Sequence, residues 1–304
     1  MPNFYCLDVV KNIREHGYRV ELYPLDNNFQ IAPKRFMKLY RDMCPSVVIL
    51  FAASGITSNL SENKAVIKKM TEHSLIISDY VHRIIDPQQV TFLSRRHIVI
   101  DSIRKNTPLP GSFVYLTQDL AQELEAPSLR TIPYVLLVSL RYLYYRTLLS
   151  IAAHLHNTSL VTYADVVALK AHDDLVGDSQ LGNAGLPWVP HIHRHLNLKK
   201  IKRTKKSQVK TYLTLLNPLL SRIPGMEVPA IKESDLGELR ALPLIATGKL
   251  AKKVERALTP LNVWAIFPDS PWSLNKRVFF LPLGFHIKPD DQRTIVDSLA
   301  SLSQ

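Results

Sequence analysis

The chain has 304 residues, 46% of them hydrophobic and 21% charged, and is long enough to bury one large core and a smaller one. Its formal net charge of +12 predicts an attraction to anions, whether phosphorylated small molecules, nucleic acid or an acidic membrane surface. Only Cys6 and Cys44 are present, which excludes a disulfide framework and a cysteine-rich zinc site and favours a reducing, cytoplasmic location. The N-terminus shows no signal-peptide pattern.

In the first hundred residues, short apolar stretches alternate with stretches of helical periodicity. We expect helices at 7–17, 34–43 and 61–73, an extended segment at 19–25, and strands at 47–51, 75–77 and 98–100. Wholly apolar, β-branched strands that alternate with helices predict a mainly parallel sheet covered on both faces.

The remaining two thirds mix helices with a few strands. We expect a strand at 111–117, a mostly helical region at 118–176, a linker at 177–190, a helix at 205–222, strands at 242–246, 263–267 and 278–281, and helices at 248–258 and 289–302. The most apolar long stretch, 132–155, contains Arg141 and Arg146, which predicts a core helix rather than a membrane span. The predicted fold class is α/β, with a large domain over 1–180 and a small C-terminal α/β domain over 181–304.

Polar residues follow the predicted strands of the first domain. They are Ser54, Asp79, Ser102 and, three residues further on, Lys105. Because a parallel sheet places its ligands beyond the carboxyl ends of its strands, we expect these residues at one edge of the sheet. Taken alone, an Asp at a strand end is more often a helix cap and a Lys beside a basic turn is more often solvated. Their order and spacing together favour a site.

Two segments carry a resemblance to a known family. They are Leu75-Ile-Ile-Ser-Asp-Tyr-Val-His82 and His97-Ile-Val-Ile-Asp-Ser-Ile-Arg-Lys-Asn-Thr-Pro-Leu-Pro-Gly111. They are similar to the cofactor core of the DegT/DnrJ/EryC1/StrS sugar aminotransferases, which bind pyridoxal 5'-phosphate (PLP). The resemblance implies the PLP-dependent transferase fold type I, that of aspartate aminotransferase.

The resemblance also implies residue roles. Lys105 is expected to bind the cofactor as an imine and to act as the catalytic base. Asp79 is expected to keep the ring nitrogen protonated, and His82 to contact the phenolic oxygen. Ser102 and Arg104 are expected at the phosphate. Ser54 is expected near the ring because of its position after the strand at 47–51, and not because of the resemblance. A lysine, a buried carboxylate and phosphate-binding hydroxyls are what PLP requires of a protein.

The implied activity is transfer of an amino group from an amino acid to a keto sugar, either free or linked to a nucleotide, by a homodimer that spans no membrane. Members of the family carry a further N-terminal segment with a phosphate-binding turn, which this chain is expected to lack. The alternative is therefore a non-catalytic or truncated relative that acts as a binding or partner subunit.

Two other clusters are assigned no chemistry. His191, His193 and His195 have no carboxylate or cysteine beside them and are expected to be surface histidines in a loop rather than metal ligands. The basic run at 199–206 lacks interleaved aromatic residues, which favours a solvated charged face over nucleic-acid binding.

Overall fold

The computed structural model describes residues 1–102, 112–123 and 189–303, together with 136–137, 140–141, 143–145, 147–148, 151, 160 and 163. The chain divides into two compact units. The first contains Met1–Asp101, Val114–Thr117 and Asn197–Gln304, and the second contains Ser102–Phe113 and Gln118–Leu196. The expected domain boundary at 180 lies outside the described residues, so the division there stays a prediction.

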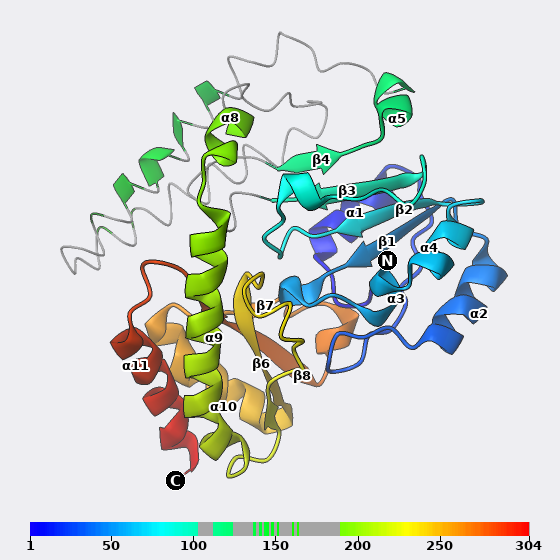
Figure 1. Cartoon of the computed structure of the whole chain (residues 1–304). Coiled ribbons are helices and arrows are strands. Elements are labelled where there is room, and N and C mark those ends of the chain that lie inside the picture. Colours follow the sequence, from blue (N-terminus) through cyan, green and yellow to red (C-terminus); the bar gives the residue numbers. More distant parts are fainter. Residues whose placement is uncertain are drawn as a thin grey trace. The chain divides into compact units, whose positions relative to one another are not determined.

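The first unit contains the expected parallel sheet (Figure 1). Its strands are β1 (Val47–Phe51), β2 (Leu75–Asp79) and β3 (His97–Asp101), followed at the edge by β4 (Phe113–Tyr115). Phe51 pairs with Asp79, and Asp79 with Ile100, so the three parallel strands end together. Leu50 and Ile76 lie on the same face of the sheet and are fully buried, whereas Ile49 and Ile77 on the other face are only partly buried. The strands predicted at 47–51, 75–77 and 98–100 are confirmed.

The helices around this sheet are α1 (Leu7–Glu15), α2 (Pro33–Met43), α3 (Asn59–Glu62) and α4 (Lys64–Met70). The single helix predicted at 61–73 is wrong, because the side chain of Asn63 accepts a hydrogen bond from the Val66 N–H and begins a new helix. The extended segment at 19–25 joins no sheet and makes isolated bridges at Tyr23 and Leu25.

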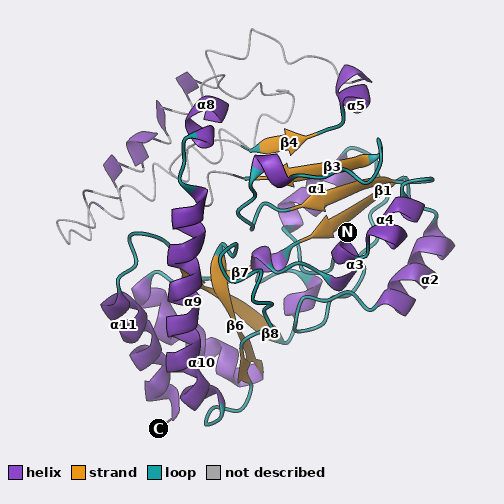
Figure 2. Cartoon of the chain, in the orientation of Figure 1, coloured by secondary structure: helices purple, strands orange, loops and turns teal. Residues whose placement is uncertain are grey.

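The same unit contains a second, antiparallel sheet in the order β5-β6-β8-β7. The strands are β5 (Met226–Glu227), β6 (Ala241–Thr247), β7 (Ala265–Ile266) and β8 (Lys276–Pro282). Figure 2 shows α9 (Leu198–Leu220), α10 (Gly248–Leu258) and α11 (Pro289–Ala300) gathered beside this sheet. Helix α9 begins at Leu198 rather than at 205, because the Asn197 side chain caps it by accepting a hydrogen bond from the Lys200 N–H at 2.9 Å.

Three chain segments join the two sheets, and we call them the joint: residues 53–57, 82–84 and 235–241. The Arg240 N–H donates to both the Ser54 and the His82 carbonyl oxygens at 3.0 Å. The Ile84 N–H donates to the Glu238 carbonyl at 2.9 Å. The Ser54 hydroxyl donates to the Ala241 carbonyl at 2.6 Å. The end of β1, the loop after β2 and the start of β6 are therefore fixed to one another.

Ion pairs reinforce the joint. Arg83 is half-buried and contacts the carboxylates of Asp235, at 2.9 Å, and Glu238. Lys202 of α9 reaches the same Glu238 at 2.7 Å. Pairs withdrawn from water to this degree are less screened by salt than surface pairs.

The described helices of the second unit are α5 (Gln118–Glu123) and α8 (Val189–Arg194), and the described residues at 136–137, 140–141, 143–145, 147–148 and 151 are helical. The core helix predicted at 132–155 is wrong for the side chains described there, since Leu137, Leu140 and Tyr144 are 48%, 54% and 51% exposed. Apolar composition predicts a helix, but it does not predict whether other elements pack against that helix and bury it. Among the described residues no helix is long and apolar enough to cross a membrane.

We predict that Gly55→Ala destabilises the protein. Gly55 has φ +99°, and a Cβ there would lie 2.7 Å from the His82 carbonyl oxygen and 2.9 Å from the Leu239 Cα. Left-handed strain and overpacking together lower the free energy of unfolding by about 3 kcal/mol or more, measured by urea denaturation. Gly17→Ala is the control, because Gly17 has φ +83° but open space around it, and it should lose only about 1–2 kcal/mol. Equal losses in the two variants would contradict close packing at the joint.

Candidate functional site

Asp79 is a buried carboxylate at the carboxyl end of β2, with 2% of its surface exposed. The Tyr5 hydroxyl donates to Oδ2, and the Val81 N–H donates to Oδ1 at 3.0 Å. The backbone of Asp79 is held as well, because its carbonyl accepts from the Ala52 N–H at 2.9 Å. Hydrogen bonds to both oxygens fix the plane of the carboxylate and stabilise its charged form.

Tyr5 comes from the segment before α1, and sequence reasoning assigned it no role at the site. Its ring meets the Phe51 ring edge-on, with centroids 5.1 Å apart. Burial, and then the charge of Asp79, raise the pKa of Tyr5 far above its ordinary value. The phenol is therefore protonated at neutral pH and acts as the donor. No sequence pattern links these residues, because the pairing joins positions 74 residues apart.

His82 is fully buried within the joint. Its ring lies among Phe51, Phe267 and Phe280, with centroids 5.0, 5.9 and 5.4 Å away. Arg240 Nη1 lies 3.0 Å from Nε2, and since a guanidinium only donates, Nε2 is the acceptor. The Ser54 N–H lies 3.3 Å from Nδ1. The role of His82 at a phenolic oxygen stays a prediction.

Ser54 is also fully buried, and its hydroxyl bonds the Ala241 carbonyl. Its described contacts are structural ones within the joint, and its place near a cofactor ring stays a prediction.

Ser102 directly follows β3 and is 4% exposed. Within the described part of the chain its Oγ is buried and has no hydrogen-bond partner. A buried hydroxyl normally bonds a protein group, water or ligand, so this oxygen is suited to a ligand. Its neighbour Asp101 accepts a hydrogen bond from the Tyr115 hydroxyl at 3.1 Å. Lys105 and Arg104 lie outside the described residues, so their roles stay predictions.

Solved structures resemble this chain, although no protein-family model and no curated protein matches its sequence. A DegT DnrJ EryC1 StrS aminotransferase from Brucella abortus has a TM-score of 0.58 and 11% identity, over 99% of this chain and 78% of that one. The aminotransferase TlmJ from Streptoalloteichus hindustanus has a TM-score of 0.56 and 12% identity, over 100% and 79%. The sugar aminotransferase CalS13 from Micromonospora echinospora has a TM-score of 0.54 and 14% identity, over 99% and 79%.

This chain has the PLP-dependent transferase fold type I. The predicted fold is thereby confirmed. Identities of 11–14% establish the fold and leave membership of the sugar aminotransferase family a proposal. In this fold the carboxyl end of β2, where Asp79 lies, is the edge at which a parallel α/β sheet presents its ligand-binding groups.

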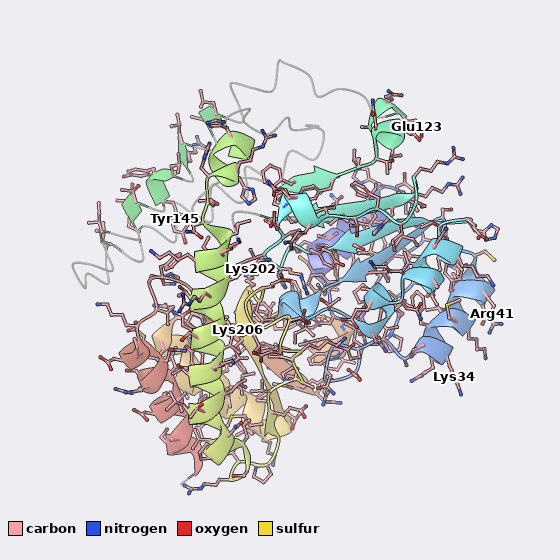
Figure 3. All side chains as sticks on the ribbon, in the orientation of Figure 1. Lys34, Arg41, Glu123, Tyr145, Lys202 and Lys206 are labelled. Atoms are coloured by element: carbon pink, nitrogen blue, oxygen red, sulfur yellow. The ribbon has the colours of Figure 1, made fainter. Side chains whose placement is uncertain are left out.

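Lys205 corrects the prediction of a solvated charged face at 199–206. It is 3% exposed, and its Nζ donates to the Leu239 carbonyl at 3.0 Å and the Arg240 carbonyl at 3.4 Å. Lys202 and Lys206, on either side of it along α9, carry the ion pairs with Glu238 and Glu233 (Figure 3). The signal was present in the sequence: an α9 begun at 198 places Lys205 on the buried stripe with Val209, Tyr212 and Leu216.

The prediction for the three histidines is also partly corrected. They lie in or beside the short helix α8 rather than in a loop, and His193 is 5% exposed with its ring 5.1 Å from that of Phe113. His191 and His195 are exposed, as predicted. In the described segments no group of His, Cys, Asp and Glu side chains is suited to a metal ion.

We predict a pH-dependent stability contribution from Lys205. Burial, and then the charge of Arg240, lower the pKa of Lys205 from 10.5 to about 7. Between these values the unfolded chain binds the proton and the folded protein does not, so the stability contributed by this group is fully present above pH 10.5 and is lost as the pH falls to about 7.

The measurement compares the protein with Lys205→Met by urea denaturation at several pH values. The free energy of unfolding of the parent protein should rise relative to the variant by up to about 1.4 kcal/mol per pH unit over this range. Lys206→Met is the control, since Lys206 is exposed and pairs with Glu233 on the surface. A pH-independent difference between the parent and Lys205→Met would contradict the lowered pKa.

Proposed function

We propose that this protein is a PLP-dependent aminotransferase with Lys105 as the residue that binds the cofactor. The observation that carries the proposal is the buried carboxylate of Asp79 at the carboxyl end of β2, held by Tyr5 and Val81, in a chain with the type I fold. A carboxylate in this position stabilises a positive charge on a pyridine ring nitrogen through a medium of low dielectric constant.

The described residues fit the cofactor in two respects. The Asp79 carboxylate suits a protonated ring nitrogen, and the buried Ser102 hydroxyl suits a phosphate oxygen. By the resemblance of the sequence, Arg104 is assigned to the phosphate and His82 to the phenolic oxygen of the ring. Ser54 is assigned to the surroundings of the ring from its position after β1.

PLP, when bound, supplies the electron sink that stabilises negative charge at the α-carbon of an amino acid. The protein's own residues bind, orient and move protons. Asp79 keeps the ring nitrogen cationic, which makes the sink effective. Lys105 Nζ takes the proton from the α-carbon of the amino donor. In the second half of the reaction it delivers a proton to the acceptor carbon that receives the amino group. Burial of Asp79 and Tyr5 keeps water from competing for the carboxylate.

For the substrates, we propose an amino acid as donor and a keto sugar as acceptor. The similarity to CalS13, described as a sugar aminotransferase, supports the sugar, and the net charge of +12 suits a nucleotide-linked one. We further propose a homodimer in the cytoplasm, where the free thiols of Cys6 and Cys44 stay reduced.

The first test is cofactor labelling. PLP titrated into the purified protein should give a new visible absorption band, and borohydride reduction should fix one cofactor to the peptide that contains Lys105. Lys105→Ala should abolish both signals. Lys38→Ala is the control, because Lys38 is an exposed lysine of α2 and should leave both unchanged.

Labelling spread over several surface lysines would contradict the proposal. It would favour the alternative of a relative that keeps the fold without the cofactor.

A second test addresses the substrate. The PLP-loaded protein, converted with an amino donor, should return to its starting spectrum on addition of a nucleotide-linked keto sugar, at least about tenfold faster than on addition of a 2-keto acid other than the one derived from the donor. Because differential transition-state binding sets such a ratio, about 1.4 kcal/mol of contacts to the sugar suffices. Equal rates with both acceptors would remove the sugar from the proposal while leaving amino transfer in place.

A further inference from the structure

Tyr5 donates a hydrogen bond to the carboxylate that the proposed function assigns to the ring nitrogen. The phenol donates to Oδ2 of a carboxylate that is 2% exposed, and Tyr5 is itself 7% exposed. A hydrogen bond from a neutral donor to a buried carboxylate is among the stronger ones in proteins, because water does not compete for it. Tyr5 therefore affects both the orientation and the charge of Asp79.

The position of Tyr5 is fixed by its neighbours in the chain. The Asn3 carbonyl accepts from the Trp272 N–H at 3.3 Å, and the Asn3 side chain accepts from the Leu25 N–H at 3.0 Å. Phe4 is fully buried against Trp272, with ring centroids 5.0 Å apart. A hydroxyl held this firmly keeps a constant position relative to the end of β2.

We propose that Tyr5 is a positioning residue that acts through Asp79 on the ring nitrogen of the cofactor. This inference rests on the proposed function. The Tyr5 hydroxyl and the Val81 N–H each hold one oxygen, so the carboxylate keeps one plane when a cationic ring nitrogen approaches it. Without the hydroxyl, the carboxylate attracts a ring cation less strongly, whereas a ring without a nitrogen is bound as before.

The chain offers a matched control. Tyr115 donates to Oδ2 of Asp101 at 3.1 Å, and Asp101 ends the neighbouring strand and is 3% exposed. Because Asp79 pairs with Ile100 and side chains alternate along a strand, Asp101 projects to the opposite face of the sheet. Tyr115→Phe thus removes the same kind of hydrogen bond from a buried strand-end carboxylate on the other face.

The experiment measures dissociation constants for two ligands. One is PLP, and the other is its 1-deaza analogue, in which carbon replaces the ring nitrogen. Tyr5→Phe should weaken PLP binding by about tenfold, a typical effect of losing a hydrogen bond to a charged group, and change the analogue by less than about twofold. Tyr115→Phe should change neither constant by more than about twofold.

Each outcome either supports or overturns the positioning role of Tyr5. Equal weakening of both ligands by Tyr5→Phe, or no weakening, overturns the positioning role, because a general structural role does not distinguish the ring nitrogen. If the unsubstituted protein binds neither ligand, the proposed function fails and this inference fails with it.

Folding of Tyr5→Phe is checked by its unfolding midpoint. If it does not fold, 3-fluorotyrosine at position 5 replaces it as the test variant. This variant keeps a hydroxyl that is a better donor, and it should tighten PLP binding without tightening the analogue; tightening of both, or of neither, counts against the proposal.

Discussion

The structure depends on one bifurcated contact, in which the Arg240 N–H bonds the carbonyl oxygens of both Ser54 and His82. The Ser54 carbonyl lies in the turn after β1, and the His82 carbonyl lies in the loop after β2. Arg240 directly precedes β6. A parallel sheet and an antiparallel sheet, which have no strand in common, are thus connected through the backbone. Gly55 permits this approach, because any Cβ there meets the His82 carbonyl and the Leu239 backbone.

Several charged side chains of the joint are largely withdrawn from water. Arg83 is satisfied by Asp235 and Glu238, and Glu238 also receives Lys202. Lys205 bonds the carbonyls of Leu239 and Arg240, and its lowered pKa reflects first its burial and then the neighbouring guanidinium. Removing one member of such a network leaves the others buried without their full set of partners, which costs more than the pair itself contributes.

The joint and the candidate site share a loop of a few residues. Asp79 ends β2, Val81 donates to its carboxylate, and His82 and Arg83 belong to the joint. The same loop therefore holds the Asp79 carboxylate through Val81 and connects the two sheets through His82 and Arg83. A binding group supported by so many contacts moves little when its ligand arrives, and little of the binding free energy goes into ordering it.

The sequence by itself predicted the strands at 47–51, 75–77 and 98–100, because wholly apolar, β-branched stretches between helical ones are typical of buried parallel strands, and the structure extends the last two to 75–79 and 97–101. It also predicted that Asp79 and Ser102 lie at the carboxyl ends of these strands, and through its resemblance to a family it predicted the fold type that the solved structures confirm. The bounds of two predicted helices were wrong because of local capping. Asn63 divides the helix predicted at 61–73, and Asn197 begins α9 earlier than its apolar periodicity indicated.

Only the tertiary structure decided which residues meet across long stretches of chain. Tyr5 and Asp79, Ser54 and Ala241, and Lys205 and Leu239 are brought together by the packing of whole elements. The exposure of Leu140 was decided in the same way. The physical reason is that periodicity states which face of an element is apolar, whereas the polar partners within a core depend on which elements come to lie against that face.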